Sequence, residues 1–431
     1  MKRMILAGMA ALGVLAGCGG PDDAPATSAA APGELQVLDW PLPGAVPGTS
    51  AADLSVSHDG TILLSWIDSQ PGRRHSFRYS TWDTSRQRWT RAPMTIAIGN
   101  SMFVNAADTP HIAASLDGAL WAHWLQKNGE GAFAYDIALA RSPDGANWSP
   151  PLVPHDDGTL TEHGFVSLWP HGTDLLGIAW LDGRATAAAD HEAHAAHDAE
   201  GHHGRGATAL RAALVDPTRR KVLESVVDTR VCDCCQTAVA LTSRGPLLFY
   251  RGRSPEEIRD VLVSRLEGNV WTAPKRVHAD GWRVEGCPVN GPAAAGHGHD
   301  VVAAWYTEAG GEPQVRLAHS ADAGDGFGEP LVLDAGAPVL GRVAVALDGQ
   351  QAGALWLREE ADGQSLWYAR FTPDLSRELG RQQVARLQGR GLGTGFPQLG
   401  FHGGVAHVVW TDVVDGRPQL RGARLVASGA G

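Results

Sequence analysis

The sequence lacks the features of two large classes of protein. Its formal charge is −11 and no basic stripe runs through it, which argues against a nucleic-acid-binding protein. Beyond its first residues, no apolar run is long enough to cross a bilayer. We therefore expect no nucleic-acid partner and no membrane-spanning segment in the mature chain.

Phenylalanine and tyrosine are also scarce, and turn-forming residues take up much of the composition. The chain has 9 Phe and 5 Tyr against 15 Trp, together with 53 Gly and 26 Pro. Abundant turn residues with bulky aromatics indicate many short strands rather than long helices. With 431 residues, of which 43% are apolar, the chain is long enough for one large all-β repeat fold.

The first residues decide the expected compartment. A positive start is followed by an apolar core, Met4 to Leu15, which is too short for a permanent membrane helix. The core ends in Leu15-Ala16-Gly17-Cys18, which resembles the lipobox of bacterial lipoproteins. The resemblance implies cleavage before Cys18 and acylation there, palmitate included. It also implies a lipid anchor in the cell envelope, and Gly19 favours the outer membrane. The alternative is an ordinary secretory signal with a chance cysteine.

These features divide the chain into unequal parts. We expect a signal peptide over residues 1–17 and a flexible tether rich in Pro, Ala and Ser over residues 18–33. A single domain should follow over residues 34–431, carrying a His-rich loop insertion at residues 186–206.

A repeat of about fifty residues predicts the fold of that domain. A strand of small residues, a Gly-containing turn and a second strand ending in an aromatic recur seven times. Each unit has room for two further strands, and four strands in about 50 residues form a propeller blade. We therefore predict an all-β propeller of four-stranded blades, with seven blades and six as the alternative. The recurring aromatics should pack in the core, and they are Trp66, Trp124, Trp180, Tyr250, Trp305, Trp356 and Trp410.

The last unit is one strand short. The early segment Glu34–Trp40 reads ELQVLDW and has the composition of a strand. It would complete the last blade and close the ring.

Two turns carry a motif that points to a family. Asp in such a turn accepts backbone N–H groups, Gly adopts a positive φ, and the aromatic seals the turn. The pattern S-x-D-x-G-x-x-[WF] resembles the Asp-box, or BNR repeat, of sialidase-like propellers. The resemblance implies a fold and not an activity. The residues are Ser320, Asp322, Gly324 and Phe327 in one turn, and Ser142, Asp144, Gly145 and Trp148 in a turn one residue shorter.

The resemblance to sialidases does not extend to a catalytic set. Those enzymes hold a sugar carboxylate with three arginines and use a Tyr–Glu pair with an Asp acid/base. The chain lacks the R-I-P-type motif that usually carries the first arginine, and no Tyr–Glu pair can be picked out. Glycoside chemistry needs charged groups on one face. The candidates are Arg251, Arg259, Glu256 and Asp260, in the segment YRGRSPEEIRD.

Cysteines form the most unusual cluster. Apart from Cys18, the chain has four cysteines, which lie in the segments VCDCCQT and GCPVNGP. Both segments directly precede the inner strand of a blade, in units four and five, so they should meet at one rim of the channel. The His-rich insertion and the YRGRSPEEIRD loop should reach the same rim. The four are Cys232, Cys234, Cys235 and Cys287.

Three chemical interpretations of this cluster remain open. An even number of cysteines in an oxidising compartment favours two structural disulfides. Thiolates with His163 or His111 could instead hold Cu(I) or Zn(II), and a redox dithiol is the third option. The insertion adds imidazoles suited to Cu(II), Ni(II) or Zn(II), namely His191, His194, His197, His202 and His203.

The two cysteine segments with the intervening charged loop resemble the signature of an uncharacterised subgroup of sialidase-like propeller lipoproteins in bacteria. That resemblance implies a fold and a compartment. The leading hypothesis is an envelope-tethered, non-catalytic propeller that binds a transition metal, Cu or Zn, at a Cys/His-rich rim. The alternatives are a glycoside hydrolase of the exo-sialidase type acting on surface glycans, and a protein-interaction scaffold with structural disulfides.

Overall fold

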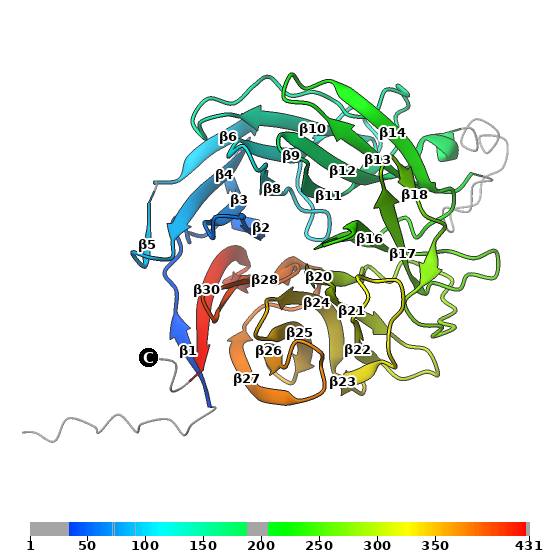
Figure 1. Cartoon of the computed structure of the whole chain (residues 1–431). Coiled ribbons are helices and arrows are strands. Elements are labelled where there is room, and N and C mark those ends of the chain that lie inside the picture. Colours follow the sequence, from blue (N-terminus) through cyan, green and yellow to red (C-terminus); the bar gives the residue numbers. More distant parts are fainter. Residues whose placement is uncertain (1–33, 71, 73, 91, 188–205, 428–431) are drawn as a thin grey trace, which may run out of the picture.

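The computed structural model of the chain is a ring of seven β-blades around a central channel (Figure 1). It describes residues 34–70, 72, 74–90, 92–187 and 206–427. Two short 3₁₀ turns lie within these residues, η1 (Arg184–Thr186) and η2 (Gly391–Thr394). No described helix has the length and apolar character needed to cross a membrane. The all-β propeller prediction is confirmed.

Each blade is an antiparallel sheet, and in blades 1 to 6 the strands run in chain order from the channel outward. The strands of blade 1 are β2 (Thr49–Val56), β3 (Ile62–Gln70), β4 (Arg74–Asp83), β5 (Arg88–Trp89) and β6 (Met94–Gly99). Those of blade 2 are β7 (Met102–Phe103), β8 (Ile112–Ala114), β9 (Leu120–Lys127) and β10 (Tyr135–Ser142). Blade 3 contains β11 (His163–His171), β12 (Leu175–Asp182), β13 (Ala209–Val215) and β14 (Lys221–Asp228).

The remaining blades follow the same plan. Blade 4 contains β15 (Ala238–Thr242), β16 (Gly245–Arg251), β17 (Val261–Glu267), β18 (Val270–Trp271) and β19 (Lys275–Arg276). Blade 5 contains β20 (Ala293–His297), β21 (Asp300–Thr307), β22 (Gln314–Ser320) and β23 (Leu331–Ala335). Blade 6 contains β24 (Val339–Leu347), β25 (Ala352–Glu360), β26 (Gly363–Phe371) and β27 (Glu378–Leu387).

The two ends of the chain meet in blade 7, which contains β28 (Gln398–His402), β29 (Val405–Val414), β30 (Arg417–Ala427) and β1 (Leu35–Asp39). Strand β1 pairs antiparallel with β30, from Leu35 opposite Ala427 to Asp39 opposite Ala423. In Figure 1 the blue β1 lies beside the red β30. The early segment therefore closes the ring as predicted, and the blades number seven rather than six.

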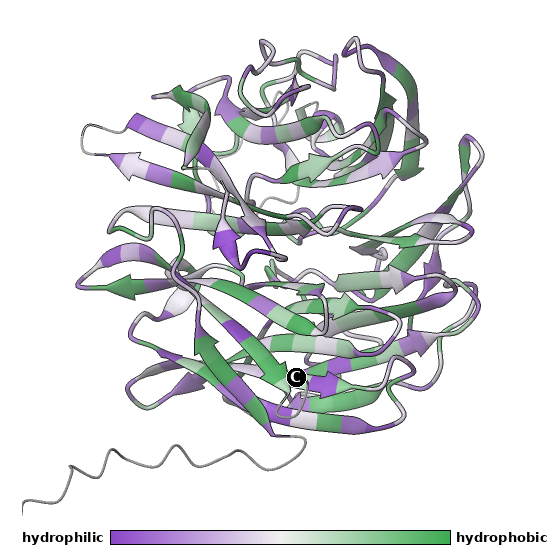
Figure 2. Cartoon of the chain, turned by 60° about the vertical axis from the view of Figure 1, so that its left-hand side comes forward, coloured by the Kyte–Doolittle hydropathy of each residue, from purple (hydrophilic) through white to green (hydrophobic). Residues whose placement is uncertain are grey.

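The second strand of each blade explains the recurring aromatics. It lies between two other strands, and its faces pack against neighbouring blades, so it forms a nearly continuous apolar run. Figure 2 shows apolar stretches along the strands, interleaved with polar residues. All seven recurring aromatics are at most 8% exposed, which confirms their role in the core.

The shorter Asp-box joins two blades. The Asp144 carboxylate accepts backbone N–H groups from Ala146 and Asn147, both at 2.8 Å. The following Trp148 ring packs edge-on against Tyr79 of blade 1, with 6.0 Å between ring centroids. The turn therefore orients an aromatic side chain that links blade 2 to blade 1.

The second Asp-box is built in the same way between blades 4 and 5. Asp322 accepts the Ser320 hydroxyl at 2.7 Å and the Gly326 N–H at 3.0 Å. The ring of Phe327 then lies edge-on to Phe249 of blade 4, at 6.0 Å. Both Asp-boxes therefore orient an aromatic ring that contacts the preceding blade.

Replacing Trp148 by alanine should lower the free energy of unfolding by about 2 kcal/mol, because an edge-to-face aromatic pair and its buried area are lost. Urea unfolding followed by tryptophan fluorescence and circular dichroism would measure this. Trp148→Phe keeps the ring contact and should lose less than half as much. Equal losses in the two variants would contradict the inter-blade role.

Candidate functional site

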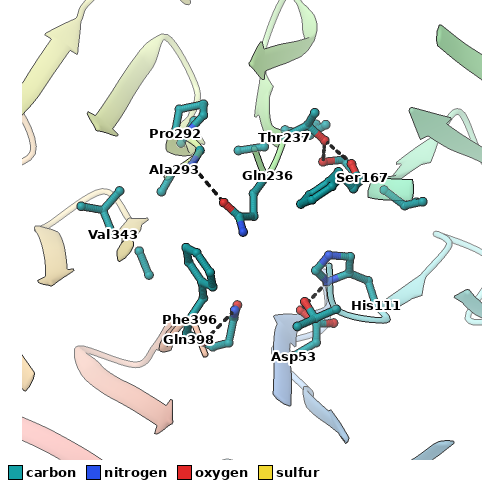
Figure 3. Close-up of a pocket in the computed structure, with 18 of the residues that line it drawn as sticks. Asp53, His111, Ser167, Gln236, Thr237, Pro292, Ala293, Val343, Phe396 and Gln398 are labelled. Atoms are coloured by element: carbon teal, nitrogen blue, oxygen red, sulfur yellow. Dashed lines mark hydrogen bonds and ion pairs between the residues drawn. The ribbon is translucent and has the colours of Figure 1, made fainter. Parts of the chain in front are cut away.

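A cavity of about 320 Å³ opens at one end of the central channel. Residues from all seven blades line it, most of them on the inner strands. Figure 3 shows Asp53 and His111 joined on one side of this hollow, with Gln236 and Phe396 around it. The cavity is therefore where the blades bring separate segments of the chain together.

The inner strands lose their regularity at this cavity. Strands β2, β11 and β24 each contain a bulge, and within it Ala51, Phe165 and Arg342 adopt φ values of 53°, 51° and 51°. A left-handed conformation costs a residue other than glycine on the order of 1 kcal/mol, and such strain clusters at functional sites. These three residues with left-handed backbone therefore mark this end of the channel as a candidate functional site.

The cysteine segment of blade 4 lies on the same rim, directly before cavity-lining Gln236. The N–H of Val231 donates to Thr208 O and that of Cys232 to Arg251 O, each at 2.9 Å. These bonds hold the segment between Thr208, just before β13, and the YRGRSPEEIRD loop. The cysteine segment and the charged loop therefore meet at one rim, as the strand register predicted, whereas the histidines of the insertion lie outside the described residues.

Three sulfur atoms converge within this segment. The Sγ atom of Cys232 lies 3.1 Å from that of Cys235 and 3.8 Å from that of Cys234. Cys232 and Cys235 are 1% and 2% exposed, whereas Cys234 is partly exposed. One ligand atom from each lies within 4.8 Å of the others, so the tight turn presents three sulfurs to one point.

The electrostatics of the cluster favour one thiolate. Hydrogen bonds from the thiols of Cys234 and Cys235 hold the pKa of Cys232 well below its usual range, and the nearby Arg259 guanidinium adds to the effect. Arg259 Nη1 donates to Cys232 Sγ at 3.2 Å. Burial raises the pKa of Cys235. Of the three thiols, Cys232 is therefore the one whose surroundings favour the thiolate.

The fourth cysteine reaches the cluster from the chain before blade 5. Cys287 is exposed, and its Sγ lies 3.5 Å from Asp233 Oδ1. Gln236 ties this chain to the rim, because its Oε1 accepts the Gly291 N–H at 2.9 Å while its Nε2 donates to Ala107 O at 2.8 Å. Cys287, Cys234 and Asp233 also have ligand atoms within 4.8 Å of one another.

All four of these cysteines are free in the structure. No disulfide joins any cysteine in the described part of the chain, and the expected disulfides stay a prediction. Cys18 lies outside the described residues, and its lipidation likewise stays a prediction.

His163 faces carboxylates instead of thiols. Its ring is fully buried and stacks on that of His155, with 3.7 Å between centroids and 2° between planes. Its Nε2 lies 3.0 Å from Asp157 Oδ2, and its Nδ1 lies 3.2 Å from Thr161 O. The structure therefore does not bring His163 together with the thiols. The five histidines of the insertion, from His191 to His203, lie outside the described residues.

Buried contacts of Arg251, Arg259 and Asp260 hold loops in place. Arg251 is 1% exposed and donates only to backbone carbonyls. Asp260 accepts the Trp282 N–H at 3.1 Å, and Glu256 is exposed. None of these, nor Arg259, lines the cavity. Their side chains do not converge on one face of the cavity, which is what glycoside chemistry needs.

His111, which the sequence offered as a partner of the thiols, instead pairs at the cavity with Asp53, which the sequence did not single out. His111 Nδ1 pairs with Asp53 Oδ1 at 2.9 Å. Burial disfavours the charged imidazole, but the Asp53 carboxylate outweighs burial and raises the pKa of His111. The loop between β7 and β8 brings His111 to this place, and no residue spacing in the sequence indicates the pairing.

Behind this pair lies a buried network of two carboxyls and one phenol. The Tyr135 hydroxyl lies 2.5 Å from Glu162 Oε1 and 3.3 Å from Asp108 Oδ2. Burial raises the pKa of Asp108 to about 7 and that of Glu162 to about 8. The phenol proton can bridge to only one carboxyl at a time. A carboxyl that keeps its proton relieves the repulsion between the two groups.

Comparisons with known proteins find only distant structural likeness. Neither a protein-family model nor a curated protein matches this chain. A protein of unknown function from Dyadobacter fermentans is 13% identical over 91% of this chain and 99% of its own, with a TM-score of 0.48. An α-L-arabinofuranosidase from Fusarium graminearum is 11% identical over 90% and 96%, with a TM-score of 0.46. The endosialidase of phage phi92 is 10% identical over 91% and 69%, with a TM-score of 0.45. No family follows from these values.

Proposed function

We propose that this protein binds one soft metal ion, Cu(I) before Zn(II), through the thiolates of Cys232, Cys234 and Cys235. The observation that carries the proposal is the convergence of the three sulfurs beside a buried guanidinium. Thiolate ligands select Cu(I) and Zn(II) over harder ions.

The spacing of the sulfurs supports such an ion. Thiolates about 2.3 Å from a metal in a tetrahedral or trigonal set lie about 3.8–4.0 Å apart. The Cys232–Cys234 distance of 3.8 Å matches this, whereas the 3.1 Å between Cys232 and Cys235 has to widen by about 0.7 Å. Three sulfurs without an imidazole favour the monovalent, softer ion.

The charges also support metal binding. Metal binding by thiols releases their protons. The surroundings of Cys232 favour its thiolate, which lowers the cost of removing its proton when a metal ion binds. The guanidinium of Arg259 offsets part of the negative charge that three thiolates leave around a monovalent ion.

The test uses the full chain without a His tag, isolated anaerobically, reduced, and titrated with Cu(I) against bicinchoninate. We expect one Cu(I) per chain at high affinity. Replacing Cys232 and Cys235 together by serine should weaken binding by at least about 100-fold, because two of three sulfur ligands are lost.

A variant without residues 188–205 is the matched control, because it removes the histidine tract and leaves the thiols. It should still bind one Cu(I). If the variant with serine at positions 232 and 235 bound as much copper as the wild type, the proposal would be wrong. A non-reducing thiol count showing both cysteines oxidised in the protein as isolated would also contradict it, and would favour the disulfide or redox interpretation.

A further inference from the structure

Cys234 belongs to two overlapping sets of ligand atoms. The inner set consists of Cys232, Cys234 and Cys235, and the outer set of Asp233, Cys234 and Cys287. Exposure decreases inward, since Cys287 is exposed, Cys234 is partly exposed and Cys232 is 1% exposed. The two sets therefore form a short path from solvent to the buried sulfurs, with one cysteine in common.

We propose that incoming Cu(I) binds first to the outer set. In this loading role, Cys287 is the exchange ligand that accepts Cu(I) from a thiol-bearing carrier. The ion then passes through Cys234 to the inner set. This proposal rests on the proposed metal binding. Its partner is defined by chemistry, as a small thiol or a protein dithiol that delivers Cu(I) as its thiolate complex.

The transfer is a ligand exchange without redox change. Cys287 loses its proton to water as its sulfur bonds to Cu(I). The bond between Cu(I) and the carrier sulfur breaks, and the released thiolate takes up a proton. Copper stays Cu(I) throughout, and the same exchange repeats from Cys287 to the inner sulfurs.

The composition of the two sets gives the transfer its direction. The outer set includes the Asp233 carboxylate, a hard ligand that Cu(I) binds poorly. That carboxylate also faces Arg253 Nη1 at 3.5 Å and Arg259 Nη1 at 3.9 Å, which compete with a metal ion for its oxygens. The inner set is all sulfur and more deeply buried, so Cu(I) should be held more tightly there.

The surroundings of Cys287 leave room for an incoming carrier. Three consecutive residues, Glu285, Gly286 and Cys287, are exposed. A side-chain carbon placed on Gly286 would meet no atom within 4 Å. A bulky thiol complex can therefore approach Cys287. It cannot reach Cys232 and Cys235 directly, because both are buried by the surrounding residues.

The experiment follows Cu(I) transfer from a Cu(I)–glutathione complex to the full chain, and from the chain to bicinchoninate, by stopped-flow absorbance. Cys287→Ser should still bind one Cu(I), with affinity within about three-fold of wild type, because its inner sulfurs are intact. Both transfer rates should fall at least about ten-fold, because the accessible thiolate is lost. Glu285→Gln, which changes the same exposed loop, should leave the rates within about two-fold.

Each outcome decides between the proposals. Unchanged rates in Cys287→Ser would overturn the loading role while leaving metal binding intact. Loss of bound copper in Cys287→Ser would also overturn it, because Cys287 would then be an equilibrium ligand. A wild-type chain that binds no copper would overturn the proposed function and the loading role together.

Discussion

Replacing Arg251 by alanine is expected to lower the free energy of unfolding by about 3–5 kcal/mol, because buried carbonyls lose their donors. The guanidinium donates to Asn290 O at 2.7 and 3.1 Å, to Arg259 O at 2.6 Å and to Tyr306 O at 2.9 Å. It also lies 4.8 Å from the centre of the Trp282 ring. The Arg251 side chain thus connects the YRGRSPEEIRD loop of blade 4 to the segment before blade 5 and to strand β21 of blade 5.

Urea denaturation, followed by circular dichroism, measures this loss. Arg283→Ala is the matched control, because that arginine is 65% exposed and pairs with the equally exposed Glu285 at 2.7 Å. An exposed pair of this kind is worth less than about 1 kcal/mol. If Arg251→Ala were as stable as the control while abolishing turnover of a fluorogenic sialoside, the structural role would be wrong and the glycoside hydrolase alternative would gain support.

Stability should fall as the pH rises from about 5 to about 8, by about 3 kcal/mol from Glu162 alone. Burial raises the pKa of Glu162 to about 8 and that of Asp108 to about 7. The folded chain therefore binds these protons more tightly than the unfolded chain. Their stabilisation is complete below the unfolded pKa near 4 and is lost as the pH passes through the folded values.

The test of this network is Glu162→Gln, which keeps an oxygen acceptor for the Tyr135 hydroxyl and cannot ionise. Its free energy of unfolding should vary less with pH than that of wild type over the same range, and should exceed it at about pH 8. Glu256→Gln, at an exposed carboxyl outside the network, should follow the wild-type profile. Parallel profiles for wild type and Glu162→Gln would contradict the assigned protonation.

Much of the fold was predictable because propeller blades repeat. The spacing of the aromatics from Trp66 to Trp410 counts the blades, since each aromatic occupies the same buried place on a second strand. The closing role of β1 was predictable from a missing strand in the last unit. Local irregularities, such as the loop that splits the inner strand of blade 2 into β7 and β8, left no periodic signal.

The candidate site was predictable only in part. Register placed Cys287 beside the cysteines of blade 4, because both segments hold the same position in adjacent blades. The same reasoning linked His163 to the thiols, but the side chain turns toward Asp157 and stacks on His155. Register locates a backbone segment on a rim, whereas the direction of a side chain depends on the neighbours that pack around it.

The sequence by itself therefore determined the class of fold, the candidate closing strand and the rim on which cysteines gather, and it left six blades as the alternative to the seven that the structure contains. These properties follow from hydrophobic periodicity and strand order, which are local or repeated along the chain. Only the tertiary structure decided that Arg259 donates to Cys232, that Cys234 is common to two ligand sets, and that the Tyr135 hydroxyl lies between two carboxyls. The contacts of Arg259, Cys287 and Tyr135 join residues far apart in sequence, and their distances depend on how neighbouring blades and loops pack.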